Sequence, residues 1–215
     1  PIFNGTDGSL PYAGLLAAGR GNFYGTTAGG GTHDLQAPYT GGGTLFELSR
    51  PGSHQNQWSL RVLYNFGASV GDGVSPAGGL ISDWRGNLYG TTIYFDGGVE
   101  GSERSGTAFE LVRPAFGQTQ WTERQLNNFG GISTNLQGAL PNGELVADRR
   151  GNLYGTNEIG GANGSFVDGG TVFELTPPSP GQLEWNERVL WSFGAKGDGD
   201  SPLSGLIADG RGNFY

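Results

Sequence analysis

Short apolar runs broken by glycine and asparagine recur along the chain, and their second occurrence shows the pattern most clearly. Four strand signals follow one another there: GLISD (79–83), NLYGTT (87–92), TAFEL (107–111) and WTERQLNNF (121–129). The first two are joined by a tight turn in which Gly86 and Asn87 suit a positive φ. No stretch of useful length shows the 3.6-residue period of an amphipathic helix. The pattern predicts an all-β fold of short antiparallel strands.

The last strand of each unit alternates between two faces. In the first unit one face carries Trp58, Val62, Tyr64 and Phe66, and the other carries Arg61 and Leu63. A period of two over nine residues indicates a strand with one buried face.

The same phrases return at a nearly fixed distance. GRGNFYGTT (19–27) recurs as WRGNLYGTT (84–92), as RRGNLYGTN (149–157) and, shortened, as GRGNFY (210–215). The FEL element and a tryptophan recur with it, which gives a unit of about 62 to 65 residues. Four antiparallel strands per unit at this period predict an array of β-propeller-type blades, about 3.5 repeats in a single domain over residues 1–215. The predicted units are repeat 1 (about 3–66), repeat 2 (67–129), repeat 3 (130–193) and a partial repeat 4 (194–215).

Three and a half blades are too few to close a ring, since propellers usually have four to eight. We therefore expect this chain to be a fragment of a longer one, so that the remaining blades of the same protein are its first expected partners. Self-association is the other route by which open ends would be covered.

The phrase GLI.D.RGNLYGTT, followed by GG, GT.FEL and W..R.L..FG, resembles the GloVer tandem repeat, a family of bacterial surface and secreted proteins. The resemblance covers the whole chain. It implies a propeller-like repeat domain that is extracellular or on the cell surface, and it carries no established catalytic residues. The first unit departs from the motif, because Ala18 stands where the later units have Asp83, Asp148 and Asp209.

Composition narrows the choice of partners. The 215 residues include 43 glycines, 12 % aromatic and 15 % charged residues and no cysteine, and the net charge is −8. Few charges and many aromatics argue against disorder. An acidic chain is disfavoured as a partner of nucleic acid or of an anionic membrane. There is no run of 18 apolar residues, so membrane insertion is not expected.

A glutamate and an arginine lie 14 residues apart in every full unit, each in the middle of a predicted strand. Across the hairpin of strands three and four they would face each other and form structural cross-strand pairs. The pairs are Glu47 with Arg61, Glu110 with Arg124, and Glu174 with Arg188.

Strand parity places the connections into strand one and those between strands two and three on one face of the fold. These connections hold ten acidic and two basic residues, so their own charge of −8 equals the net charge of the chain. The opposite face carries arginines in equivalent turns. Because binding residues concentrate in long loops on rigid scaffolds, we expect the acidic loops to bind ligand. The candidates are Asp7, Asp72, Asp96, Asp168, Asp198, Asp200, Tyr39 and Tyr94, with Asp198 and Asp200 as the position for a possible Ca²⁺.

No motif for a nucleophile, a phosphate loop or a metal cluster is present. The sequence therefore predicts a protein without catalytic residues or a cofactor other than the possible Ca²⁺. We expect an extracellular scaffold for binding or adhesion to a carbohydrate or a protein. One alternative is a self-assembling subunit of an extracellular filament or surface layer, held by the acidic face of one copy against the arginines of the next. A hydrolase or lyase built on a propeller is the other.

Overall fold

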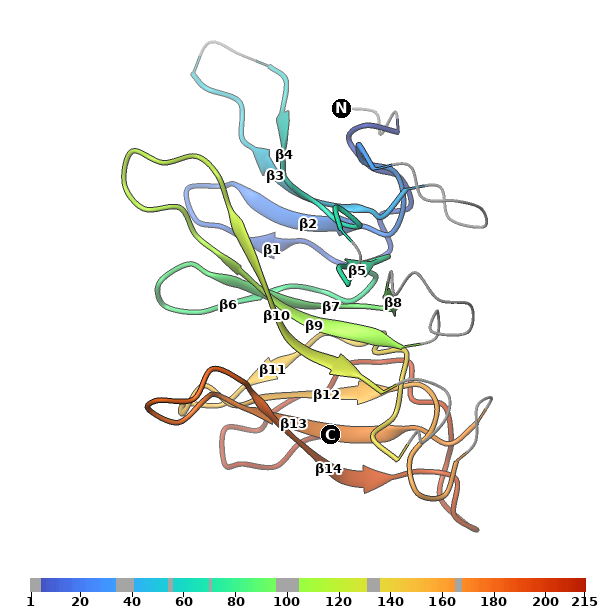
Figure 1. Cartoon of the computed structure of the whole chain (residues 1–215). Coiled ribbons are helices and arrows are strands. Elements are labelled where there is room, and N and C mark those ends of the chain that lie inside the picture. Colours follow the sequence, from blue (N-terminus) through green and yellow to red (C-terminus); the bar gives the residue numbers. More distant parts are fainter. Residues whose placement is uncertain are drawn as a thin grey trace.

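A computed structural model describes residues 5–33, 41–53, 56–69, 71–95, 105–130, 136–164 and 168–215. Within these ranges the chain is all-β, with fourteen strands and no helix. Three four-stranded antiparallel sheets follow one another along the chain and are stacked face against face (Figure 1). The predicted all-β fold of four-stranded antiparallel units is confirmed.

Each sheet is a meander whose strands pair in chain order. Sheet 1 contains β1 (Leu16–Ala17), β2 (Phe23–Thr27), β3 (Thr44–Ser49) and β4 (Ser59–Asn65). Sheet 2 contains β6 (Ile81–Ser82), β7 (Leu88–Thr92), β9 (Gly106–Val112) and β10 (Thr122–Phe129). Sheet 3 contains β11 (Val146–Ala147), β12 (Leu153–Asn157), β13 (Thr171–Thr176) and β14 (Asn186–Ser192). A separate two-stranded sheet joins β5 (Gly73–Val74) to β8 (Tyr94–Phe95).

The partial fourth repeat continues the stack beyond sheet 3. An isolated antiparallel bridge joins Ala208 to Phe214, at the positions of the first two strands of the other units. Its side chains contact sheet 3, where the ring of Phe214 lies 4.3 Å from that of Tyr154. The hydroxyl of Thr156 also donates to the carbonyl of Ser204 at 2.9 Å.

A one-residue bulge interrupts the fourth strand of each full sheet. In sheet 1, Tyr64 pairs with Leu45 and Val62 pairs with Phe46, so that Leu63 is the extra residue. Leu126 and Leu190 have the same place in sheets 2 and 3. The expected strict alternation is therefore wrong at this point: the bulge lets Leu63 and Tyr64 both pack against the same hydrophobic cluster.

The glycine in the YGT phrase is required by packing. A Cβ at Gly90 would lie 2.7 Å from the ring of Phe109 and 3.1 Å from Leu80. Gly25 and Gly155 meet the phenylalanine and leucine of their own units in the same way. The phenylalanine of each FEL element thus lies flat across the second strand, a position that only glycine leaves open.

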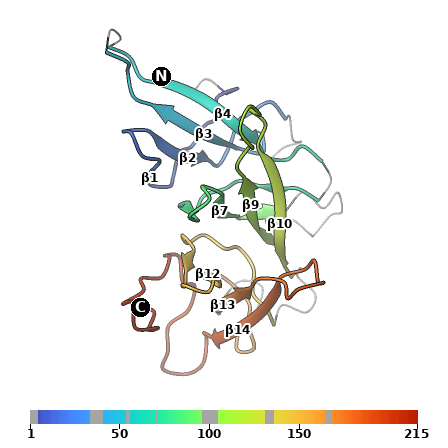
Figure 2. The ribbon, with the colours of Figure 1, turned by 90° about the vertical axis from the view of Figure 1, so that its left-hand side faces the viewer.

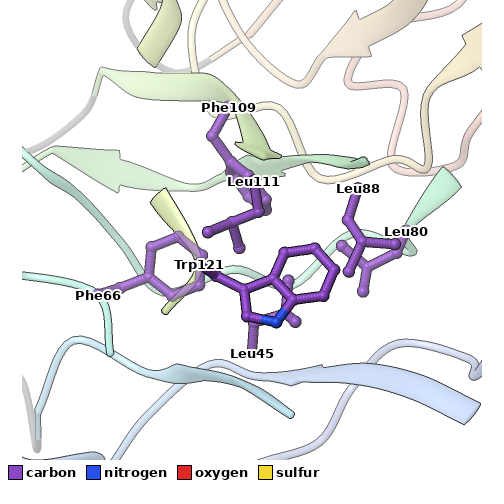
Figure 3. Close-up of a cluster of buried hydrophobic side chains, with 7 residues drawn as sticks. All are labelled: Leu45, Phe66, Leu80, Leu88, Phe109, Leu111 and Trp121. Carbon is purple, nitrogen blue, oxygen red and sulfur yellow. The ribbon is translucent and has the colours of Figure 1, made fainter. Parts of the chain in front are cut away.

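The core lies between the sheets. The first cluster joins sheets 1 and 2, and Figure 3 shows Trp121 among Leu45 and Phe66 on one side and the side chains of sheet 2 on the other. The second cluster joins sheets 2 and 3 in the same way. We call the surface of a sheet that faces the preceding sheet its leading face, and the surface that faces the following sheet its trailing face.

Two edges run along the stack, and Figures 1 and 2 show them from different sides. The turns between β1 and β2 and between β3 and β4, with their equivalents, lie together at what we call the turn edge. The connections between the second and third strands lie at the opposite side, the loop edge. The order of the antiparallel strands fixes this separation, as the sequence predicts.

Candidate functional site

The turn edge carries one polar network in repeated form. In sheet 2, Asp83 Oδ1 accepts hydrogen bonds from the backbone N–H groups of Arg85 at 2.8 Å and of Asn87 at 2.9 Å. The side chain of Asn87 donates to Asp83 Oδ2 at 3.0 Å and to Glu110 Oε1 at 2.9 Å. The hydroxyl of Tyr89 also donates to Glu110 Oε1, at 3.0 Å. The Asp-x-Arg-Gly-Asn phrase is thus a closed turn tied to the third strand.

The same turn recurs in the later units. Asp148 Oδ1 accepts from the backbone N–H groups of Arg150 and Asn152, and Asp209 accepts from the corresponding groups of Arg211 and Asn213. The pKa of Asp148 is lowered: burial raises it, but these bonds and those from the side chains of Asn152 and Tyr154 lower it more.

The first unit builds this turn differently. Ala18 offers no carboxylate, and the N–H of Asn22 donates to the carbonyl of Gly19 instead. Arg20 takes a positive φ of 53° in this turn. Asn22 still donates to Glu47, so the first turn lacks only the hydrogen bonds that the aspartate accepts in the later units. Because a positive φ is uncommon for a residue other than glycine, Arg20 also gives this turn an unfavourable backbone conformation.

The glutamate and arginine that lie 14 residues apart are cross-strand partners in all three sheets. Their closest nitrogen and oxygen atoms are 2.9 Å apart in sheet 1, 3.6 Å in sheet 2 and 2.6 Å in sheet 3. The arginine side chains are largely exposed, whereas the carboxylates are mostly covered. Pairs of this kind contribute about 0.2–1 kcal/mol each.

The tyrosine in this network remains a hydrogen-bond donor at neutral pH. Burial and the carboxylate of Glu174 raise the pKa of Tyr154 to about 12. Burial and Glu110 raise the pKa of Tyr89 in the same direction. The network is therefore a set of neutral hydroxyl and amide donors that bond to a carboxylate, and an arginine balances the charge of that carboxylate. Because these groups bond to one another, we assign the network a structural role.

Of the aspartates proposed as ligands, Asp72 lies in the interior. It is only 8 % exposed, and its Oδ2 accepts from the hydroxyl of Tyr64 at 3.1 Å and from the N–H of Ala68 at 3.0 Å. Burial raises the pKa of Asp72, although these hydrogen bonds oppose the effect. These bonds hold the loop between sheets 1 and 2 in place. Asp72 is therefore a buried residue and not part of an exposed ligand-binding surface.

Three other proposed residues lie in the loop edge and take part in its structure. The carbonyl of Asp7 accepts from Thr44 Oγ1, and the carbonyl of Asp168 accepts from the N–H of Gly160. Tyr94 lies in β8, opposite Val74, and is half-buried. Asp96 and Tyr39 lie outside the described residues.

Asp198 and Asp200 are exposed and lie in one connection that leads into the partial fourth repeat. Asp198 forms an isolated bridge with Lys196. Across the described ranges, no group of three or more histidine, aspartate and glutamate side chains is arranged to hold a metal ion. Two carboxylates alone supply few of the six to eight oxygens that Ca²⁺ takes.

The structure also brings together residues that sequence reasoning missed. Glu123 and Glu187 are half-buried on the leading faces of sheets 2 and 3, and Glu187 Oε2 accepts from the side chain of Asn127 in sheet 2 at 2.8 Å. Burial raises the pKa of Glu187 to about 7. Burial and the charge of Asp72 together raise that of Glu123 to about 7. Their common position, two residues after the repeated tryptophan, is the signal by which the sequence marks them.

The stacked sheets, the repeated turn network and the repeated clusters define an all-β tandem-repeat protein. The chain belongs to the Gloeobacter/Verrucomicrobia repeat family, whose profile matches residues 1–215. No curated protein matches the chain. Within the described residues, no helix is long and apolar enough to span a membrane.

Proposed function

We propose that this chain is a non-catalytic extracellular scaffold, built of propeller-type blades, that binds a carbohydrate or a protein ligand at its loop edge. The observation that supports this proposal is the division of polar residues between the two edges. At the turn edge the same asparagine, tyrosine, glutamate and arginine recur in all three sheets, and in sheets 2 and 3 they bond, together with the repeated aspartate, to one another. A catalytic group would be expected to stand out from such a repeat, because catalysis requires a particular constellation rather than an identical one in every sheet.

The loop edge differs from one unit to the next. The connections between the second and third strands have different lengths and sequences, such as 28–43 in the first unit and 158–170 in the third. Asp168, Asp198 and Asp200 are exposed along this edge. Variable loops on a rigid repeated frame are a common arrangement for binding sites, and the acidic side chains favour a ligand with amino or hydroxyl groups.

The test is an array of neutral and amino-bearing oligosaccharides, followed by titration calorimetry with the best-bound member. The variant pair Asp198→Asn and Asp200→Asn is expected to weaken binding at least about tenfold, the effect of losing roughly 1.4 kcal/mol of interaction. Glu184→Gln, an exposed charge change on the turn edge, is the matched control and should leave binding unchanged. Equal weakening by the control, or cleavage of the oligosaccharides, would contradict the proposal.

A further inference from the structure

The turn edge of sheet 2 contains a hollow lined by three arginines. Its volume is about 340 Å³, and Arg85, Arg113 and Arg124 lie around it together with Glu110. Three guanidinium groups and one carboxylate give its lining a net charge of +2. Sheets 1 and 3 pack against the two faces of sheet 2, so the hollow opens at the side of the stack and not at one of its ends. Its volume lies at the lower end of the range for small-molecule sites.

Two of these arginines are positioned by side-chain contacts. The guanidinium carbon of Arg85 lies 4.7 Å from the centroid of the Trp84 ring, which is a cation–π arrangement. Arg124 Nη1 lies 3.6 Å from Glu110 Oε2, the longest of the three cross-strand pairs, and the arginine side chain is 68 % exposed. Because a guanidinium group carries five N–H donors, both side chains keep donors for a ligand.

Arg113 is positioned by the turn beside it. Its backbone N–H donates to Asn87 Oδ1 at 3.0 Å. Its side chain crosses Gly86, where an added Cβ would lie 3.0 Å from Arg113 Nη1 and 3.1 Å from its Cδ. Within the ranges that the structure describes, neither Arg113 nor Arg85 lies within ion-pair distance of a carboxylate. Two positive groups are thus held at one hollow without an ion-pair partner from the described part of the chain.

The equivalent arginines of the other units are arranged differently. In sheet 1 they line two separate hollows, with Arg20 and Arg50 at one and Arg61 at the other. In the third unit Pro177 stands at the position of Arg113. A difference between units at otherwise repeated positions favours a specific site over a structural element of the repeat.

The chemistry of this surface matches a carboxylate carried by a sugar. The planar fork of a guanidinium group fits the two oxygens of a carboxylate. Beside Arg85, the indole of Trp84 is 87 % exposed and offers a flat apolar surface. The C–H face of a sugar ring packs on such a surface by dispersion, whereas the acidic side chain of a peptide brings no ring to it. The two features together favour an acidic sugar over an acidic peptide.

We propose that this hollow binds a uronic-acid residue of an acidic polysaccharide, with the carboxylate held by Arg85, Arg113 and Arg124. The sugar ring lies against Trp84. This is a second site, on the edge opposite the acidic loops, and it does not rest on the function proposed above. The loop edge favours ligands with amino or hydroxyl groups, so the two edges select sugars of different charge.

The test is titration calorimetry of the chain with trigalacturonate. We expect one site per chain with a Kd of about 1 mM or tighter. Arg113→Gln should weaken binding at least about tenfold, because it removes charge-assisted hydrogen bonds. Arg113→Lys keeps the charge without the planar fork and should weaken binding less. Both variants keep the backbone bond from residue 113 to Asn87, so both are expected to fold.

The controls separate this site from diffuse charge and from the loop edge. Arg150→Gln removes the equivalent of Arg85 from the unit that contains Pro177, and it should leave the binding of trigalacturonate unchanged. The variant pair Asp198→Asn and Asp200→Asn should also leave it unchanged. A failure of the loop-edge proposal would therefore not affect these measurements.

Four results would overturn the proposal. The first is an unchanged chain that does not bind trigalacturonate. The second is a loss of affinity in Arg150→Gln equal to that in Arg113→Gln, which would indicate diffuse attraction. The third is equally tight binding of the neutral methyl ester of trigalacturonate, which would show that the carboxylate is not recognised. The fourth is equally tight binding of triglutamate, which would show that the sugar ring contributes nothing.

Discussion

Tyr24 lies edge-on against Trp121, with ring centroids 5.9 Å apart and planes at 74°, although the two residues belong to different sheets. Offset and edge-on aromatic pairs contribute energy beyond the area they bury. At the equivalent positions of the next junction, Tyr89 of sheet 2 and Trp185 of sheet 3 both pack against the second hydrophobic cluster.

Trp121→Ala should therefore lower the free energy of unfolding by about 3 kcal/mol, since it opens a cavity between sheets 1 and 2. Urea denaturation followed by circular dichroism measures the change. Trp84→Ala is the matched control, because Trp84 is 87 % exposed and its ring lies against the guanidinium of Arg85, and it should shift stability by no more than about 0.5 kcal/mol. Similar losses in both variants would show that the tryptophan does not join the sheets.

Stability should fall as the pH rises from about 5 to about 8. The pKa values of Glu123 and Glu187 are raised from 4.5 to about 7, so the folded state retains protons that the unfolded chain has lost. This contribution is complete below the unfolded value and disappears as the pH passes the folded value. With an allowance for partial exposure, each glutamate contributes on the order of 2 kcal/mol. Asp148, whose pKa is lowered, acts near pH 4 and below, outside this interval.

Denaturation midpoints at pH 5 and pH 8 test this dependence. The double variant Glu123→Gln, Glu187→Gln should remove most of the difference between the two pH values, while Glu184→Gln should leave it in place. A wild-type chain that is more stable at pH 8 than at pH 5 would refute the assignment.

Gly90→Ala should destabilise sheet 2 by about 2 kcal/mol, the middle of the range for overpacking with strain. The added methyl group would lie 2.7 Å from the ring of Phe109, which is fully buried in the cluster between sheets 1 and 2. Gly199→Ala is the control, because nothing lies within 4 Å of a Cβ there and its φ is not positive. Thermal unfolding of the two variants compares them, and equal melting temperatures would count against the packing argument.

Ala18→Asp should raise the free energy of unfolding by about 0.5–1 kcal/mol, the contribution of a typical hydrogen bond. The variant has the sequence DGRGN of the fourth unit, in which Asp209 accepts from the N–H of Arg211 at 2.7 Å and from the side chain of Asn213 at 2.7 Å. Ala18→Asn introduces a side chain of the size of aspartate without its charge, and it should raise the free energy of unfolding by less. Chemical denaturation decides, and a loss of stability in Ala18→Asp would mean that the first turn cannot adopt the repeated form.

Much of the strand layout was predictable because each strand is short and bounded by turn residues. The residues 14 apart, such as Glu174 and Arg188, predicted their own pairing, since a hairpin of this length places them opposite each other. The glycine and asparagine of the repeated turn likewise indicated a tight connection. These are local signals, and local geometry was sufficient to interpret them.

The interfaces between sheets could not be predicted in the same way. Alternation in β10 gave no indication that Leu126 is a bulge residue, because a bulge depends on its partner strand. Nothing in the strand pattern singled out Glu123, and strand parity placed Asp72 among the acidic loops. Both are covered by neighbouring elements that a single strand's pattern does not encode.

The stacked arrangement has a consequence for how such a chain can change in length. Each internal sheet is held by a leading face that fits the trailing face of its neighbour, and the leading-face residues are the same type at both junctions. A duplicated unit inserted between two existing ones would find compatible surfaces on both sides without any new interface having to arise. Variation in the loops lies at the side of the stack, away from these contacts, so the number of units and the identity of the loops can drift independently.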